Sequence, residues 1–303
     1  MISARGLHYS FPGGIPALCG IDFDVLPQGR IALLGANGAG KTTLLLHLNG
    51  SLRPERGSIC IDGKEVGYDR RSLTRWRSLV GLVLQDPDDQ LFAGTVYQDV
   101  SFGPLNLGLS EADVRARVEA ALQAMRIEHL ADRPVHMLSF GQKRRAAIAG
   151  LVAMGPRVLL LDEPTAGLDP LGVTHLLAAL RGLAESGAAV VFSTHDVDLA
   201  YGWADTIALI KGGRVIAAGQ PDDVFADPAL LRQTGLRTPL VLDVALRARA
   251  AGLVADDRPL PRRPNELTVW LQGEDPASAG TAGARHPRAA TSSGRRERGE
   301  EHS

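Results

Sequence analysis

A glycine-rich stretch, GANGAGKTT at residues 35–43, follows directly on a short apolar run, IALL at residues 31–34. It fits the spacing Gly-x4-Gly-Lys-Thr, in which a loop joins a buried strand to a helix. Glycines let the backbone wrap closely, so that its N–H groups point inward at phosphate oxygens, and the helix adds its positive N-terminal end. We predict a phosphate-binding loop made of Gly35, Ala36, Asn37, Gly38, Ala39, Gly40, Lys41, Thr42 and Thr43.

Two side chains of this loop carry chemistry. Lys41 would neutralise the β and γ phosphates of a nucleotide, and Thr42 would place its hydroxyl on Mg²⁺. The alternative is a strand–helix turn without a ligand. A buried strand before the loop and a helical pattern after it argue against that alternative.

Short apolar runs alternate with helical patterns along the chain. Such runs are typical of strands buried on both faces, and the alternation predicts an α/β fold with a largely parallel sheet. The N-terminal stretch and SICIDG (58–63) alternate more and carry Gly and Pro turns, which predicts a small antiparallel layer. Residues 110–125 predict an amphipathic helix capped by Ser110. The further predicted strands are VGLVL (80–84), VLLLD (158–162), AAVVFS (188–193) and TIALI (206–210).

Bulk properties exclude several classes of protein. A formal net charge of −1 gives no reason to expect nucleic acid binding. Cys19 and Cys60 are too few for a disulfide framework and do not form a zinc-type pair. The N-terminus lacks the basic-then-apolar form of a signal peptide, and no apolar run approaches the roughly 20 residues that span a bilayer. We expect a cytoplasmic chain that works at a membrane only as a peripheral partner.

Two adjacent acids follow the strand in RVLLLDEPTAGLDP (157–170). They lie at the carboxyl end of that strand, where ligands bind in open α/β sheets. Asp162 would hold Mg²⁺ through water, and Glu163 would polarise an attacking water. A solvated acidic turn is the alternative, and the phosphate-binding loop in the same chain disfavours it.

A third segment, LSFGQKRRAAIAGLVAM (138–154), predicts a helix opened by a capping box of Ser139 and Gln142. Its first turn, with Ser139, Gly141 and Gln142, offers free N–H groups, a hydroxyl and no bulk, which suits a phosphate. The loop at 35–43 already serves one γ-phosphate. A second phosphate-binding helix therefore indicates two chains that face each other.

Together these motifs resemble those of the nucleotide-binding subunits of ABC transporters, over residues 2–235. The resemblance matches residues 35–43 to the Walker A loop, LSFGQ to the signature, Asp162 to Walker B, Glu163 to the catalytic glutamate, Asp169 in GLDP to the D-loop, and His195 in STHDVDLA to the switch histidine. It implies a P-loop NTPase of ABC type, with a mixed sheet core, an antiparallel β layer and a helical signature subdomain.

The resemblance also implies activity and assembly. ATP, bound with Mg²⁺, would be hydrolysed between two subunits paired head to tail, the Walker A loop of one facing the signature of the other. The second ATPase subunit would be the same chain or a close homologue. Integral membrane subunits, including a transmembrane coupling component and a substrate-binding component, would complete a transporter, with this chain at the cytoplasmic face of the membrane. No nucleic acid partner is expected.

The strand at 80–84 leads into Gln85, which the resemblance assigns to contact with Mg²⁺ and the attacking water. The wider run GLVLQDPDDQLFAGTVYQDVSFGPLNLGL (81–109) is similar to the ATPases of energy-coupling-factor importers, especially those of cobalt. It implies import of cobalt or nickel, with a vitamin as the alternative cargo. Asp86, Asp88 and Asp89 can in principle bind a cation directly, but such loops lack a fixed cage. We expect the loop to sense the bound nucleotide.

An aromatic side chain would stack on adenine. Alignment with the family favours Phe11, with Tyr9 as the alternative, and both residues also suit the core of the β layer. The sequence has no Asn-Lys-x-Asp guanine selector, which favours ATP over GTP.

Other classes of protein share the glycine-rich loop. A kinase or other phosphotransferase would not need LSFGQ or a switch histidine. A non-transport ABC ATPase of DNA repair would carry a long coiled coil between the loop and the signature, and the translation forms carry two ATPase domains. This chain shows neither feature.

The chain is expected to have three parts. Residues 1–235 would form the ATPase domain and residues 236–272 a short C-terminal element. PLVLDVALRARAAGL in that element permits an amphipathic helix, which would pack on its own domain or help to hold the dimer. Residues 273–303 have almost no large apolar side chains, and we predict a disordered tail.

Overall fold

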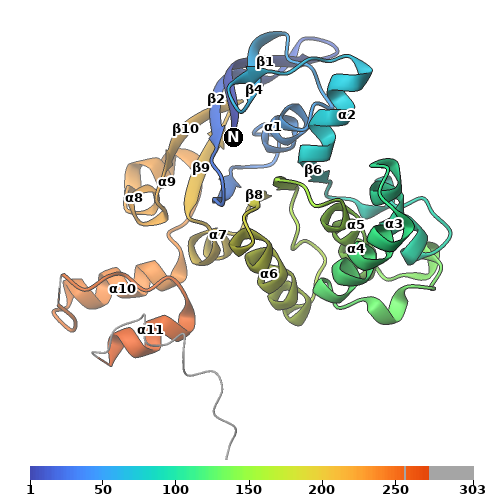
Figure 1. Cartoon of the computed structure of the whole chain (residues 1–303). Helices are drawn as coiled ribbons and strands as arrows, with labels where there is room; N and C mark the ends of the chain where they lie inside the picture. The colour runs from blue at the N-terminus through green and yellow to red at the C-terminus, as the bar shows by residue number, and fades with distance from the viewer. Residues whose placement is uncertain (256, 273–303) are drawn as a thin grey trace, which may run out of the picture. The chain divides into compact units, whose positions relative to one another are not determined.

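The computed structural model describes residues 1–255 and 257–272 (Figure 1). The chain divides into two compact units, residues 1–243 and the residues from 244 onward. The expected domain boundary after residue 235 stays a prediction. The expected tail, 273–303, lies outside the described residues.

Two β-sheets are formed by the described residues of the first unit (Figure 1). The antiparallel sheet has the strand order β2 (Ile15–Val25), β1 (Ile2–Phe11), β4 (Arg56–Ile61), β5 (Lys64–Glu65). The mixed sheet has the order β10 (Arg214–Gly219), β9 (Thr206–Lys211), β3 (Arg30–Leu34), β8 (Ala189–Thr194), β7 (Val158–Leu161), β6 (Val80–Val83).

The mixed sheet is parallel except at one edge. Strands β9, β3, β8, β7 and β6 pair in parallel, and β10 returns antiparallel to β9. Each apolar run predicted as a strand forms one, and the antiparallel layer contains both the N-terminal stretch and the segment around SICIDG. The predicted α/β fold with an antiparallel layer is therefore confirmed.

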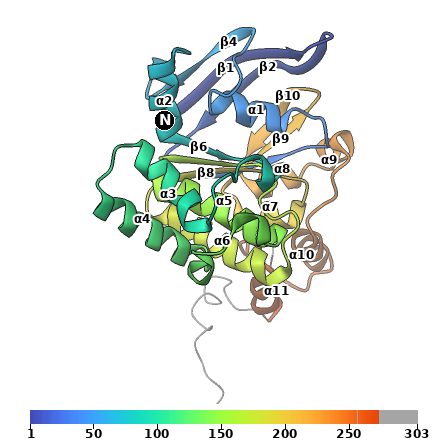
Figure 2. The ribbon, with the colours of Figure 1, turned by 90° about the vertical axis from the view of Figure 1, so that its right-hand side faces the viewer.

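Helices cover both faces of the mixed sheet. Figure 2 shows α1 on one side of it and α5, α6 and α7 on the other. Helices α3 and α4 pack on α5 and form the predicted helical subdomain with it. Ser110 caps α4 as predicted, since the N–H of Asp113 donates to its hydroxyl. The helices of this unit are α1 (Lys41–Leu48), α2 (Arg70–Leu79), α3 (Val96–Asn106), α4 (Glu111–Ala124), α5 (Phe140–Met154), α6 (Pro170–Glu185), α7 (Val197–Trp203), α8 (Pro221–Phe225) and α9 (Pro228–Thr234), with 3₁₀ turns η1 (Pro87–Asp89), η2 (Glu128–Leu130) and η3 (Val135–Met137).

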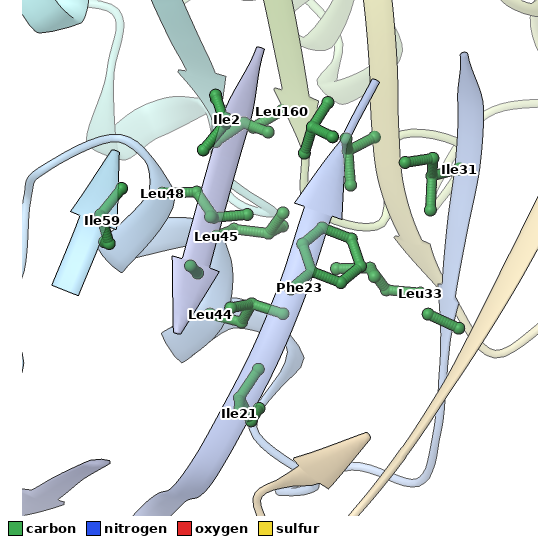
Figure 3. Close-up of a cluster of buried hydrophobic side chains, with 14 of the residues drawn as sticks. Ile2, Ile21, Phe23, Ile31, Leu33, Leu44, Leu45, Leu48, Ile59 and Leu160 are labelled. Carbon is green, nitrogen blue, oxygen red and sulfur yellow. The ribbon is translucent and has the colours of Figure 1, made fainter. Parts of the chain in front are cut away.

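Helix α1 packs between the two sheets (Figure 3). Its Leu44, Leu45 and Leu48 are fully buried. Burying each such side chain stabilises the fold by about 1.5–3 kcal/mol. They share one apolar cluster with residues of both sheets, among them Ile2, Ile21, Phe23, Leu33 and Leu160. This packing fixes the start of α1, and so the place where the glycine-rich loop ends.

Strand β6 and helix α5 approach closely at Gly81. A Cβ atom at this position would lie 1.7 Å from Cδ1 of Leu151, whose side chain is itself buried. A larger residue here would have to displace the Leu151 side chain, so glycine allows α5 to lie close against the strand that leads into Gln85.

The second unit has its own small core. The indole of Trp270 in α11 (Pro264–Leu271) is fully buried against Ala245 and Ala248 of α10 (Leu240–Ala250). Its N–H donates to the carbonyl O of Pro259 at 2.8 Å. The predicted amphipathic helix is confirmed as α10, while its role stays a prediction. None of the described helices has the length and apolar character needed to cross a bilayer.

Candidate nucleotide site

The glycine-rich loop connects β3 to α1 at the carboxyl end of the parallel strands. Gly40, the residue before α1, has a φ of 107°. A Cβ atom there would lie 2.7 Å from the carbonyl O of Ala17, so both the conformation and the space require glycine. The loop from Asn37 onward lines a hollow of about 410 Å³. This volume is in the range of small-molecule sites.

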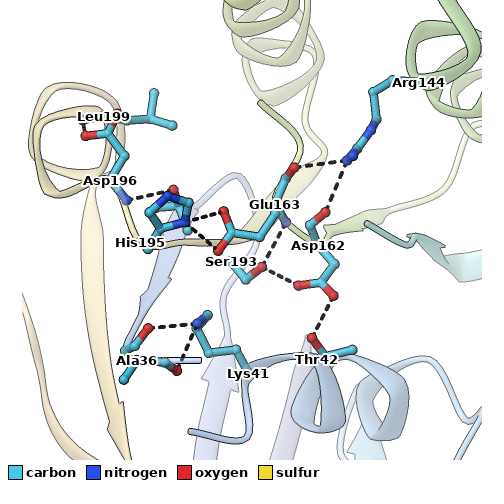
Figure 4. A network of polar contacts seen from close by, with 12 residues as sticks. Ala36, Lys41, Thr42, Arg144, Asp162, Glu163, Ser193, His195, Asp196 and Leu199 are labelled. Carbon is cyan, nitrogen blue, oxygen red and sulfur yellow. Dashed lines mark hydrogen bonds and ion pairs between the residues drawn. The ribbon is translucent and has the colours of Figure 1, made fainter. Parts of the chain in front are cut away.

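Lys41 and Thr42 are held by internal hydrogen bonds at this hollow (Figure 4). The Lys41 ammonium donates to the carbonyl O of Gly35 at 2.7 Å and of Ala36 at 3.2 Å. The Thr42 hydroxyl donates to Oδ2 of Asp162 at 2.7 Å. A cation and a hydroxyl are thus positioned at the start of a helix, where anions are favoured.

Asp162 lies immediately after β7, with a side chain that is almost fully buried. Its N–H donates to the carbonyl O of Val83 at 2.8 Å, which extends the pairing with β6 by one residue. Thr42, Gln85 and Asp162 all line the same hollow. Hydroxyl, amide and carboxylate oxygens are the hard ligands that Mg²⁺ accepts, so these residues fit that metal.

Glu163 has an unusual backbone conformation. Its φ is 46°, in the left-handed region that non-glycine residues seldom adopt. Both carboxylate oxygens lie 3.1 Å from Nδ1 of His195. The carboxylate is largely buried, whereas the imidazole is exposed. Both residues line a second hollow together with Asn37, Gln85 and Ala166, so a carboxylate and an imidazole lie beside the glycine-rich loop.

Comparison with known proteins decides the family. The ABC transporter family model matches residues 18–166. The cobalt import ATP-binding protein CbiO of Rhodobacter capsulatus is 57% identical over 274 residues, covering 90% of this chain and 98% of that protein. The energy-coupling factor transporter ATP-binding protein EcfA of Methanocaldococcus jannaschii is 47% identical over 241 residues, covering 80% and 86%. The structure of cbiO1 from Clostridium perfringens superposes with a TM-score of 0.69 and 42% identity, covering 83% of this chain and 96% of that one.

The chain belongs to the ABC transporter ATP-binding family. As an ABC ATPase it binds and hydrolyses ATP, and the resemblance found in its sequence is confirmed. The roles of individual residues in this ABC ATPase stay predictions, which the geometry constrains.

Phe11 lies where a base can reach it. It ends β1, is 42% exposed and lines the hollow beside the loop. Tyr9 packs edge-on against Phe11 and against the buried His47, with ring centroids 5.4 and 4.8 Å away, and does not line the hollow. This placement favours Phe11 over Tyr9 as the stacking residue. Ile15 of β2, which sequence reasoning missed, is exposed on the same wall.

The signature helix begins with the predicted capping box, which is confirmed. The N–H of Ser139 donates to Oε1 of Gln142 at 2.9 Å, and the N–H of Gln142 donates to the Ser139 hydroxyl at 3.4 Å. Asp169 caps α6 by accepting the N–H of Gly172 at 2.6 Å. Ser139, Gly141, Gln142 and Asp169 line neither of the two hollows described above.

Arg144 of the signature helix is fully buried and was missed by sequence reasoning. Its guanidinium donates to the carbonyl O of Asp162 at 3.3 Å, of Glu163 at 2.9 Å, and of Gln85. Burial lowers the pKa of Arg144 from its ordinary value, although nearby carboxylates, chiefly Asp162, oppose that effect. One buried cation therefore connects α5 to two segments that line the site, the one that follows β7 and the one that follows β6. Figure 4 shows its contacts with Asp162 and Glu163.

In the acidic loop after Gln85, the carboxylates of Asp86 and Asp88 are engaged by other groups of the protein. Asp86 accepts the N–H of Asp88 at 2.9 Å, and Asp88 forms an ion pair with Lys143 of α5 at 2.5 Å. Among residues 1–255 and 257–272, no cluster of three or more His, Cys, Asp or Glu side chains could hold a metal ion. The contacts favour a structural connection to the signature helix over direct cation binding by Asp86, Asp88 and Asp89.

Proposed function

We propose that this ABC ATPase powers an energy-coupling-factor importer of a divalent metal, cobalt or nickel. The observation that carries the proposal is the similarity to the cobalt import protein, which spans 90% of this chain and 98% of that protein. A match limited to the ATPase core would be compatible with any ABC importer. Import of a vitamin by the same type of machine is the competing hypothesis.

The residues around the hollow would divide the chemistry of hydrolysis. Lys41 and the loop N–H groups would bind the β and γ phosphates, and Phe11 would stack on adenine. Glu163 would act as the general base toward the attacking water. His195 would contact the γ-phosphate, oriented by the Glu163 carboxylate 3.1 Å away.

Thr42, Gln85 and Asp162 would hold Mg²⁺. When bound, the metal supplies charge neutralisation to the phosphate oxygens. The three side chains come from α1, from the loop after β6 and from the end of β7, so the sheet itself sets their spacing.

A second ATPase subunit, identical or closely similar, would complete the site. Ser139, Gly141, Gln142 and Asp169 of one subunit would face the nucleotide bound at the loop of the other. Two observations support this. These residues line neither hollow of their own chain, and the first turn of α5 presents a hydroxyl at a helix N-terminus, where anions are favoured.

An exposed aromatic pair lies in the segment that follows Gln85. Phe92 is 65% exposed and Phe102 is 49% exposed, with their rings edge-on at 4.7 Å. The backbone here is fixed, because Asp99 accepts the N–H groups of Phe92 and Ala93 at 2.9 Å each. A rigid, exposed apolar patch suits a partner surface. We assign it to the transmembrane coupling component, which would act with a substrate-binding component and place this chain at the cytoplasmic face of the membrane.

Uptake by the assembled complex tests the proposal. The wild-type chain and Glu163→Gln would each be co-expressed with the membrane proteins encoded beside it, and accumulation of radioactive Co²⁺ would be measured. We expect uptake with the wild type, and loss of uptake with an intact complex for Glu163→Gln. A complex that imports only an organic vitamin would overturn the cargo. A chain that never copurifies with membrane proteins would overturn the transport function.

A further inference from the structure

Ser193 carries a buried hydroxyl that contacts two residues of the site, Asp162 and Glu163. It lies in β8 with no exposed surface, as the next-to-last residue of the strand. Its neighbours in the strand from Ala189 to Phe192 are apolar, so a polar side chain here needs a polar partner. Figure 4 shows the hydroxyl between Asp162 and Glu163.

The Ser193 hydroxyl donates one hydrogen bond and accepts another. It donates to Oδ1 of Asp162, and it accepts the N–H of Glu163 at 2.9 Å. Asp162 therefore has both oxygens engaged, Oδ1 by Ser193 and Oδ2 by Thr42. The two bonds fix the rotation of the carboxylate, with Oδ2 toward Thr42, the second residue of α1.

The hydrogen bond from the Glu163 N–H to Ser193 pairs a backbone group that lies beyond the end of β7. At Glu163 the chain leaves β7 with a φ of 46°. A buried N–H without an acceptor is costly, and a left-handed conformation persists only where surrounding contacts hold it. The Ser193 hydroxyl holds the N–H side of Glu163, while Arg144 donates to its carbonyl O.

We propose that Ser193 is a positioning residue for ATP hydrolysis, which sets the Asp162 carboxylate and the Glu163 backbone through its one hydroxyl. The proposal rests on the assignment of Asp162 to the metal and Glu163 to the attacking water. Ser193 touches neither nucleotide nor water in this scheme, so its loss should reduce turnover and leave metal-free nucleotide binding unchanged.

The test uses the full-length chain and the variant Ser193→Ala. Partners of a metal ligand typically contribute about 10–100-fold to activity or metal affinity. We expect kcat to fall by about that factor while KM for ATP stays within about twofold. Binding of a fluorescent ATP analogue in EDTA should be unchanged, and the gain in affinity on adding Mg²⁺ should shrink. Ser101→Ala is the matched control, because Ser101 is also buried and its hydroxyl donates to the carbonyl O of Tyr97 in α3, away from the site.

A second pair of variants separates the hydroxyl from packing. Ser193→Thr and Ser193→Val have the same shape and add the same bulk, so only the hydroxyl distinguishes them. We expect the Thr variant to keep most of the turnover and the Val variant to lose it. Equal kcat for Thr and Val, or equal losses for Ser193→Ala and Ser101→Ala, would overturn the proposal. If Glu163→Gln also retained full turnover, the assignment of the site itself would have failed instead.

Discussion

His47 is a titratable side chain buried directly behind the glycine-rich loop. Its Nδ1 lies 2.7 Å from the carbonyl O of Thr43, and its ring packs edge-on against Tyr9. Burial lowers the pKa of His47 from its ordinary value of 6.5, and hydrogen bonds to backbone groups of Thr43 and Arg53 only partly oppose the shift. The folded protein therefore favours the neutral imidazole, which lies between Tyr9 and the backbone of Thr43.

The pH dependence of stability follows from that shift. The unfolded chain takes up a proton on His47 at a higher pH than the folded chain does. Its contribution to stability is thus fully present above 6.5 and is lost as the pH falls toward the lower folded pKa. We expect the melting temperature to fall more steeply between about pH 7 and about pH 5 for the wild type than for His47→Gln. Parallel curves would contradict this reading.

Some residues of the site could be predicted from sequence motifs, and others could not. Lys41, Asp162 and Glu163 were predicted because each follows a buried strand in a local motif. Arg144 lies within KRR, which reads as a basic surface, yet Lys143 is paired at the surface with Asp88 while Arg144 is fully buried. The contacts of Arg144 join residues far apart in the chain, and only the fold brings such residues together.

At the scale of elements, the apolar runs were enough to predict the strands. Parallel strands buried on both faces need continuous apolar side chains, and this requirement is visible in the sequence. The strand order was not predicted, because the runs are chemically alike and pairing depends on the crossover helices. Ser193 faces Asp162 only because β8 lies beside β7 in the sheet.

The close approach of β6 and α5 gives a prediction about packing. Gly81→Ala would place a methyl group against the buried Leu151, so we expect a loss of about 1–3 kcal/mol of stability from overpacking. Denaturant unfolding would measure it. In Gly81→Ala/Leu151→Ala the added methyl enters the space vacated by leucine, and the double variant should lose less than the sum of the two single changes. Simple additivity would show that the two side chains do not compete for space.

At the scale of the whole molecule, one chain supplies only part of each proposed ATP site. In Glu163→Gln the amide keeps the shape of the side chain but removes the charge that would polarise water. We expect the variant to bind ATP, hydrolyse it slowly and accumulate as a dimer. Gel filtration with ATP and Mg²⁺ would show this shift, with Lys64→Gln as a surface control. A variant that remained monomeric with ATP bound would argue against the head-to-tail arrangement.

The division of labour between this chain and its partners gives a second prediction at this scale. Cobalt and nickel sites generally favour imidazole ligands, whereas Asp86 and Asp88 are hard oxygen donors engaged by a backbone N–H and by Lys143. We expect the purified chain not to bind Co²⁺ or Ni²⁺ tightly, so that selectivity resides in a membrane partner. Calorimetry of the isolated chain is the measurement. Tight binding, well below about micromolar, would move selectivity onto this subunit.

The internal bonds of Lys41 and Thr42 have a consequence for how ATP enters. The lysine ammonium rests on the carbonyl oxygens of Gly35 and Ala36, and the threonine hydroxyl on Asp162. A triphosphate that binds here would have to compete with these acceptors. Its affinity would therefore reflect the difference between the hydrogen bonds that it makes with Lys41 and Thr42 and the internal hydrogen bonds that it replaces.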